Sequence, residues 1–394
     1  MVGLVETADS CPLSLLAGRQ GVYNAERRQA PAKIKNHHRG GKKMSRWFDY
    51  AHRLAANLSV AVVCALAAPV LGTAALAQDR GSWSPVSTMP SGTGDSGVVA
   101  LGGKIYIVGG STFRAHILPT SSDMGSGTWG STVNYEYDPT ADRWRERAPL
   151  PIGLSHINLV ALDHKIYAFG GFTSLVHANA QNVALVYDPG SDKWQELAPL
   201  SAALGALGVA EVGGKIHVFG GRPRDPLPVN FHEVYDPATN TWAKKSPMPF
   251  ARDHHGVVAI DGKIHIVGGR TKGQTDNVAD HDVYDPATDQ WTKAAPMPTP
   301  RSGGAAVYYH GLLLYIGGEC RKPDPNAKFG GGEAFDENEA YDSKTNTWLT
   351  LTKLPSARQA IGAASDGATA YVPGGTLRCG GLSLTDQMLA FRLK

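Results

Sequence analysis

The chain has 394 residues, a formal charge of +3 and 42% hydrophobic residues, so it is long enough to bury a large core. Its 46 glycines and 25 prolines, and the lack of long apolar helical patterns, favour many short strands joined by turns. A β architecture of this length exceeds that of an ordinary sandwich and favours an array of repeats.

The start of the chain differs in composition from the rest. Residues 1–43 are polar and basic without any period, whereas two arginines and then an apolar run over 54–71 follow Met44. A small-x-small sequence ends at Ala77, an order typical of a secretory signal peptide. The alternative is a retained anchor, but the run is short for a membrane span of ~20 residues. We predict an over-extended or disordered leader over 1–43, a signal peptide over 44–77 cleaved after Ala77, and a periplasmic or secreted protein.

The charge balance changes once this leader is set aside. Ten of the 38 basic residues and four of the 35 acidic residues lie in residues 1–78, which leaves 28 basic and 31 acidic residues and a net charge of −3. The apparent basicity therefore belongs to the leader, and the charge indicates no nucleic-acid partner. For the part that remains we expect a monomer without a membrane span.

A repeated spacing of tryptophan, glycine and tyrosine runs through the rest of the chain. Six Gly-Gly doublets each begin 26 positions after a tryptophan, and five tyrosines each stand seven positions before one. Four of these tyrosines are followed by Asp-Pro. The tryptophans are Trp83, Trp144, Trp194, Trp242, Trp291 and Trp348, and the tyrosines are Tyr137, Tyr187, Tyr235, Tyr284 and Tyr341. A repeat of about 50 residues indicates an array of small β-sheets.

This spacing resembles the kelch family over about 83–394, which implies four antiparallel strands per blade around a channel. Trp83 has no Tyr-Asp-Pro ahead of it, and the last doublet, Gly374-Gly375, is followed by an apolar segment but no tryptophan. The last blade therefore lacks its fourth strand. We predict an all-β, six-bladed kelch propeller over 78–394 whose last blade is closed by the N-terminal strand containing Trp83.

The loops indicate which face of such a propeller is functional. With the strands of a blade named a to d, the b–c segment from Gly-Gly to tyrosine spans 28, 17, 15, 16 and 24 positions. The c–d step from tyrosine to tryptophan keeps its length of seven positions. Loops that vary on a rigid scaffold usually carry the binding function. We therefore expect the face formed by the b–c and d–a connections to be the functional one.

Arginines gather on this face. Counting ten positions from each tryptophan gives the column Thr93, Leu154, Leu204, Arg252, Arg301 and Arg358. Because arginine suits bidentate recognition of carboxylate or sulfate, the pattern favours an acidic ligand. The alternative is that these arginines pair with carboxylates or cap strand ends. The predicted ligand-binding residues are Arg222, Arg252, Arg270, Arg301, Glu319 and Arg358, with Asp253, His254 and His255 beside them.

The resemblance to the kelch family implies different activities in its branches. Some kelch proteins bind acidic peptide segments through arginines at this end of the channel. Periplasmic sialic-acid mutarotases are six-bladed kelch propellers with a leader, and their site combines a glutamate near a doublet with an arginine. Glu319, followed by Arg321, is loosely similar to that pattern and is the candidate catalytic residue, although the stretch after Gly330 departs from it. Copper radical oxidases also contain kelch repeats, but the histidines here show no ligand spacing, so no metal or cofactor is expected.

Two functions follow from these observations. The first is an exported binding or interaction protein, without catalysis, whose partner is an acidic small molecule, a glycan or an acidic peptide segment. The second is a periplasmic carbohydrate-active enzyme, a mutarotase or epimerase acting on an acidic sugar. No nucleophile, metal cluster or phosphate loop stands out in the sequence, which favours the first.

Two cysteines remain after the leader. Cys320 and Cys379 each lie a few residues past a doublet, in adjacent blades and on the same face. In an oxidising compartment they can form a disulfide between two b–c loops, or they can remain two separate thiols.

Overall fold

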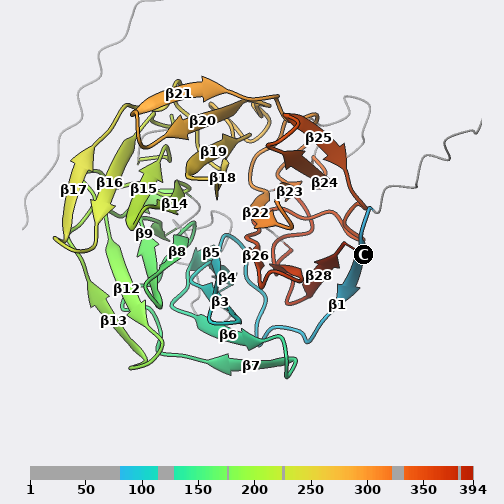
Figure 1. Ribbon diagram of the computed structural model, residues 1–394. Coiled ribbons are helices and arrows are strands. Elements are labelled where there is room, and N and C mark those ends of the chain that lie inside the picture. Colours follow the sequence, from blue (N-terminus) through green and yellow to red (C-terminus); the bar gives the residue numbers. More distant parts are fainter. Residues whose placement is uncertain are drawn as a thin grey trace, which may run out of the picture. The chain divides into compact units, whose positions relative to one another are not determined.

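The computed structural model describes residues 80–113, 128–174, 177–223, 227–321, 332–379 and 383–393; the leader predicted over 1–77 lies outside them. Six four-stranded antiparallel sheets stand in a ring (Figure 1). The innermost strands of neighbouring sheets contact one another around the axis. The prediction of an all-β, six-bladed propeller is confirmed. Among the described residues, no helix has the length and apolar character that crossing a bilayer requires.

The strands follow the chain from the inside of each blade to the outside. Blade 1 contains β2 (Gly97–Leu101), β3 (Lys104–Val108), β6 (Asn134–Asp138) and β7 (Arg143–Glu146). Blade 2 contains β8 (Asn158–Leu162), β9 (Lys165–Phe169), β12 (Ala184–Asp188) and β13 (Lys193–Glu196). Blade 3 contains β14 (Gly208–Val212), β15 (Lys215–Phe219), β16 (His232–Asp236) and β17 (Thr241–Lys244).

The remaining three blades repeat this order, and two blades carry an additional hairpin. Blade 4 contains β18 (Gly256–Ile260), β19 (Lys263–Val267), β20 (His281–Asp285) and β21 (Gln290–Lys293). Blade 5 contains β22 (Ala305–Tyr309), β23 (Leu312–Gly318), β24 (Phe335–Asp342) and β25 (Thr347–Thr350). Blade 6 contains β26 (Ala364–Ser365), β27 (Ala370–Pro373), β28 (Met388–Arg392) and β1 (Ser82–Pro85). The hairpins are β4 (Ser111–Phe113) with β5 (Thr128–Gly130), and β10 (Phe172–Ser174) with β11 (Ala178–Ala180).

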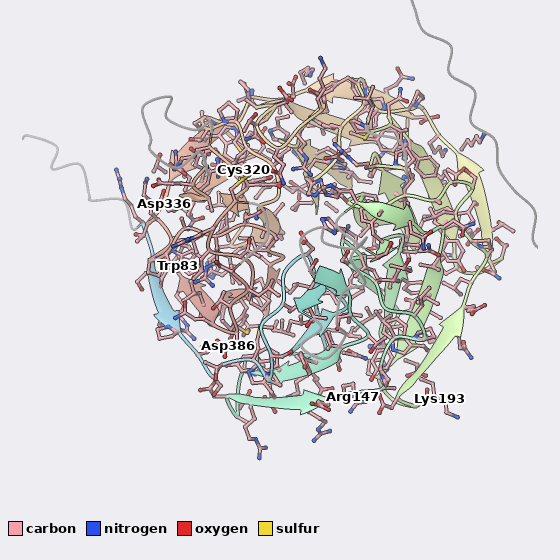
Figure 2. The ribbon with its side chains drawn as sticks, turned by 180° about the vertical axis from the view of Figure 1, so that it is seen from behind. Trp83, Arg147, Lys193, Cys320, Asp336 and Asp386 are labelled. Carbon is pink, nitrogen blue, oxygen red and sulfur yellow. A yellow bond between two sulfur atoms is a disulfide. The ribbon has the colours of Figure 1, made fainter. Side chains whose placement is uncertain are left out.

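The ring closes by joining the two ends of the repeat array. β1 pairs antiparallel with β28, and Trp83 lies opposite Phe391 with their ring centroids 4.9 Å apart. Trp83 lies at the outer edge of the ring (Figure 2). The closing strand predicted from the missing tryptophan of the last repeat is therefore present. It removes the two long sheet edges that an open array would expose.

The repeated residues connect one blade to the next. Each blade tryptophan donates its indole N–H to a carbonyl outside its own sheet, over 2.7–3.2 Å in all six cases. The Gly-Gly doublets let neighbouring blades approach closely: a Cβ on Gly268, whose φ is +64°, would stand 2.5 Å from the carbonyl oxygen of Arg301. The next residue, Gly269, donates its N–H to that same carbonyl. Glycine is required here because any side chain would push the blades apart.

Candidate functional site

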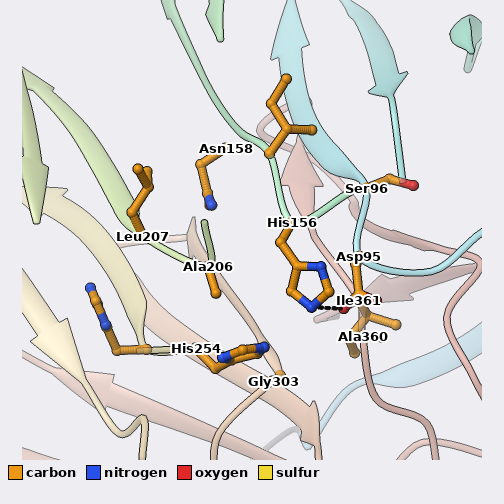
Figure 3. A pocket seen from close by; sticks show the side chains of 13 residues that line it. Asp95, Ser96, His156, Asn158, Ala206, Leu207, His254, Gly303, Ala360 and Ile361 are labelled. Carbon is orange, nitrogen blue, oxygen red and sulfur yellow. Dashed lines mark ion pairs between the residues drawn. The ribbon is translucent and has the colours of Figure 1, made fainter. Parts of the chain in front are cut away.

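A ring of six residues narrows one mouth of the channel. Each stands twelve positions after a blade tryptophan and has a left-handed backbone, with φ between 53° and 62°. Each N–H donates to the carbonyl of the preceding member over 2.7–3.2 Å, so the backbone hydrogen bonds form a closed circle. The members are Asp95, His156, Ala206, His254, Gly303 and Ala360. All of them line one pocket (Figure 3), which is the candidate site.

The structure gives the arginine column a different role from the predicted one. Arg252, Arg301 and Arg358 have 0% exposure, and their guanidiniums donate to backbone carbonyls of their own blades instead of facing the pocket. Each also has a side-chain partner, and these are Asp282 at 2.7 Å, Glu339, and Gln387 at 2.8 Å, respectively. The alternative of strand capping and carboxylate pairing therefore holds. We remove these three residues from the ligand-binding set.

The other three predicted residues do come together at the mouth. Backbone bridges join Asp253 to Arg270 and Ser302 to Glu319, which brings the d–a and b–c segments to the same face. Asp253 accepts from Arg222 Nε at 2.6 Å and from Arg270 Nε at 2.9 Å. Arg270 also forms an ion pair with Glu319 through Nη1. The result is a buried network in which two guanidiniums and two carboxylates compensate one another.

Three histidines complete the site. His254 donates Nδ1–H to Asp253 Oδ1 over 2.7 Å, which leaves its Nε2 as an acceptor. His156 Nε2 lies 3.3 Å from Asp95 Oδ1 (Figure 3). His177 comes from the β10–β11 hairpin of blade 2, and its ring centroid lies 5.0–5.1 Å from those of the other two. Two imidazoles oriented by carboxylates thus converge on one pocket, an arrangement suited to proton transfer.

Burial and the ion pairs set the protonation states of these groups. Burial lowers the pKa of His156 to about 4, with Asp95 acting in the opposite sense, so this imidazole is neutral near pH 7. Burial by itself raises the pKa of Glu319, but the Arg270 guanidinium outweighs it and leaves the pKa below its usual value. Glu319 therefore stays ionised and paired. In this arrangement it holds Arg270 in place, and the catalytic role predicted for Glu319 stays a prediction.

The three histidines also raise the question of a metal site, which the sequence did not indicate. One ligand nitrogen from each of His156, His177 and His254 lies within 4.8 Å of the others. However, Arg270 Nη2 stands 3.2 Å from Nε2 of both His177 and His254. A guanidinium fixed by Asp253 and Glu319 places a positive charge where a metal would have to sit. We therefore assign this cluster to hydrogen bonding.

Cys320 and Cys379 form a disulfide with a Cα–Cα distance of 5.1 Å. The bond joins the segment after the doublet of blade 5 to the corresponding segment of blade 6. Cys320 directly follows Glu319, so the disulfide lies beside the network at the mouth.

Sequence reasoning missed part of this site, although a signal for most of it existed. Counting twelve rather than ten positions from each tryptophan selects the ring, including Asp95, His156 and His254. Their left-handed backbone turns the side chains toward the axis, which the count alone does not show. His177 lies in a b–c hairpin outside the repeated spacing, and no sequence signal places it at the mouth.

Comparisons with known proteins agree with this architecture. The family model described as the KLHDC2/KLHL20/DRC7 Kelch-repeats domain matches residues 155–375, which is more than half of the chain. The solved structure of YjhT superimposes with a TM-score of 0.61 at 17% identity, covering 77% of this chain and 96% of that one. The chain belongs to the kelch-repeat family.

Curated relatives match shorter segments. Kelch-like protein 33 of Homo sapiens is 36% identical over 91 residues, which are 23% of this chain and 15% of the relative. Kelch repeat and BTB domain-containing protein 12 of Homo sapiens is 28% identical over 93 residues, 24% of this chain and 14% of the relative. The matched segment thus spans about one seventh of these relatives, so their likeness concerns the repeats alone.

Proposed function

We propose that this chain is an exported propeller that binds a small, neutral, polyhydroxylated molecule, a carbohydrate, in the pocket at the channel mouth. The observation that carries the proposal is that the guanidiniums there are already compensated by buried carboxylates. Arg222 and Arg270 are paired with Asp253 and Glu319, which leaves imidazole, amide and hydroxyl groups and the Asp95 carboxylate to meet a ligand. An acidic ligand would have to draw a guanidinium away from a buried carboxylate, which is costly. The signal peptide predicted over 44–77 supports export.

The binding proposal predicts a sugar-dependent gain in thermal stability. Protein produced from the full-length chain is tested against D-glucose, N-acetylglucosamine, D-glucuronate and an acidic peptide. Stabilisation by a neutral sugar should disappear in His254→Ala, because His254 offers an acceptor in the pocket. It should persist in His164→Ala, an exposed histidine whose backbone also has positive φ. Stabilisation by the acidic peptide alone would refute the proposal and restore the acidic partner.

A second candidate function is the acid–base isomerisation of a reducing sugar. It is favoured by the two aspartate–histidine pairs, Asp253–His254 and Asp95–His156, that face the same pocket. Ring opening moves the proton of the anomeric hydroxyl to the ring oxygen. His254 Nε2 can take that proton, and the imidazolium so formed can return it to the ring oxygen as the ring C–O bond breaks.

For this second function we predict faster mutarotation of α-D-glucose, followed by polarimetry. The acceleration should fall by a factor of 10²–10⁴ in His254→Ala, the usual contribution of one acid–base group. The exposed variant His164→Ala should retain it. Equal rates with and without the wild-type protein would leave the protein as a binder without catalysis.

A further inference from the structure

The β10–β11 hairpin reaches across the mouth from blade 2 and places His177 against blade 4. His177 has a φ of +63°, and its Nε2 lies 3.2 Å from Arg270 Nη2, a residue 93 positions further along the chain. The same Nε2 lies 3.3 Å from His254 Nε2. Arg270 Nη2 is also 3.2 Å from His254 Nε2, so the three nitrogens form a nearly equilateral triangle.

This triangle cannot satisfy all three of its contacts. His254 Nδ1–H is engaged by Asp253, so His254 Nε2 offers only a lone pair. If His177 Nε2 carries no proton, Arg270 can donate to both imidazoles, but the two lone pairs then face each other. If His177 Nε2 carries a proton, it can donate to His254, but its N–H then faces the N–H groups of Arg270. One contact is unfavourable in either tautomer.

Charging His177 does not remove the conflict. Burial, followed by the neighbouring His156 and His254 and the guanidiniums of Arg270 and Arg222, holds the pKa of His177 well below its usual range. His177 therefore stays neutral. A neutral imidazole in a mismatched hydrogen-bonding position is held less firmly than the ion pairs around it.

A hydroxyl group would resolve the mismatch. Its oxygen accepts from Arg270 Nη2 while its O–H donates to the lone pair of His254 Nε2, so all polar groups are satisfied. We propose that the position of His177 Nε2 is a subsite for a ligand hydroxyl, and that the His177 side chain turns away when the ligand enters. The inference rests on the proposed binding of a polyhydroxylated molecule and identifies the groups that anchor it.

The alternative ligand at this site is a divalent cation, which the lone pairs of two imidazoles could coordinate. Arg270 argues against it, because its guanidinium is held in place by Asp253 and Glu319. A hydroxyl gains a donor from Arg270, whereas a cation meets a like charge at close range. The two occupants are separated experimentally by adding Zn²⁺ alone.

Removing the His177 side chain tests the subsite independently of any sugar. His177→Ala leaves a space next to Arg270 and His254 that suits a hydroxyl group, so ethylene glycol, a small diol that is not a sugar, should bind this variant and raise its melting temperature. Wild type and His164→Ala should show no such response, although His164 has a similar backbone, with φ of +60°. Failure of ethylene glycol to bind a folded His177→Ala protein would overturn the subsite.

The same variant then connects the subsite to the proposed function. D-glucose should bind His177→Ala roughly tenfold more tightly than wild type, because no imidazole side chain has to be displaced, and should compete with ethylene glycol. Ethylene glycol binding without any sugar binding would keep the hydroxyl subsite and refute the carbohydrate proposal. Equal glucose affinity in wild type and variant would leave the proposed function standing but refute the displacement of His177 by the ligand. Zn²⁺ binding that depends on His177 would replace the hydroxyl by a metal.

Discussion

Lowering the pH from 7 to 5 is expected to destabilise the propeller by several kcal/mol, before the paired carboxylates are protonated. A large part of the cause lies in two buried histidine pairs, one in blade 3 and one in blade 4, and the buried His156, His177 and His255 act in the same direction. His217 Nδ1 donates to His232 Nε2 over 3.0 Å, and His265 Nδ1 donates to His281 Nε2 over 2.8 Å. All four rings are buried.

The direction of the effect follows from the pKa values. Burial lowers the pKa of His217 and His281 to about 3 and that of His232 and His265 to about 4. In the unfolded chain the value is 6.5. Above pH 6.5 both states are neutral and full stability is present. As the pH falls below 6.5, these histidines bind protons in the unfolded state but stay neutral in the folded state. The free energy of unfolding therefore decreases until the pH reaches each folded-state pKa.

The size of the effect is large for a folded protein. Each of these histidines lowers the free energy of unfolding by about 1.4 kcal/mol per pH unit in this window. The two pairs together therefore lower it by about 5 kcal/mol per unit. Typical stabilities of about 5–15 kcal/mol are exhausted within one to three pH units. Carboxylates with lowered pKa values, such as Asp253, lose their contribution only at lower pH. Histidine therefore controls the first stage of acid unfolding.

Blade 5 provides the matched variant for this prediction. At the positions of His265 and His281 it carries Leu314 and Asn338, and the Asn338 amide donates to a carbonyl much as His281 does. His265→Leu/His281→Asn should therefore fold, and urea unfolding at pH 5.5 against pH 7.5 should show a loss smaller by about 2–3 kcal/mol than in wild type. An unchanged pH dependence would show that these pairs do not control acid stability.

The fold was predictable because its signal is a distance along the chain. The 26-residue step runs from the tryptophan in the outer strand of one blade to the Gly-Gly after the second strand of the next, and every blade repeats it. The missing tryptophan after Gly374-Gly375 likewise predicted the pairing of β1 with β28. Such periodic constraints act on many residues at once, so one sequence is enough to show them.

The site was less predictable because it depends on orientation. Arg252, Asp253 and His254 are consecutive, yet Arg252 points into its blade while His254 lines the pocket. The left-handed backbone at His254 makes this difference, and a histidine in that conformation carries no distinctive sequence pattern. His177 depends further on a hairpin that crosses between blades. Counting positions therefore located the face and several of its residues, but not which side chains meet there.

Replacing Arg301 by leucine is expected to cost about 3–5 kcal/mol of folding stability, which makes the buried arginine column a structural element. The Arg301 side chain has 0% exposure and pairs with Glu339, which is itself only 3% exposed. Arg301 also donates to the carbonyls of Gly317 at 2.9 Å and Tyr315 at 2.7 Å. Arg301→Leu leaves a buried carboxylate without its counter-charge, which is the dominant cost.

Blade 2 shows how the same positions are filled without charge. Leu154 and Leu185 occupy the positions of Arg301 and Glu339, and both belong to the apolar core there. The double variant Arg301→Leu/Glu339→Leu should therefore be less destabilised than Arg301→Leu alone, since no buried charge is left unpaired. Urea unfolding of wild type, the two single variants and the double variant measures this coupling. If the double variant loses as much free energy of unfolding as both single variants added together, the carbonyl contacts of Arg301 stabilise the protein and its ion pair with Glu339 does not. Loss of sugar binding in a double variant that remains folded would instead return Arg301 to the ligand site.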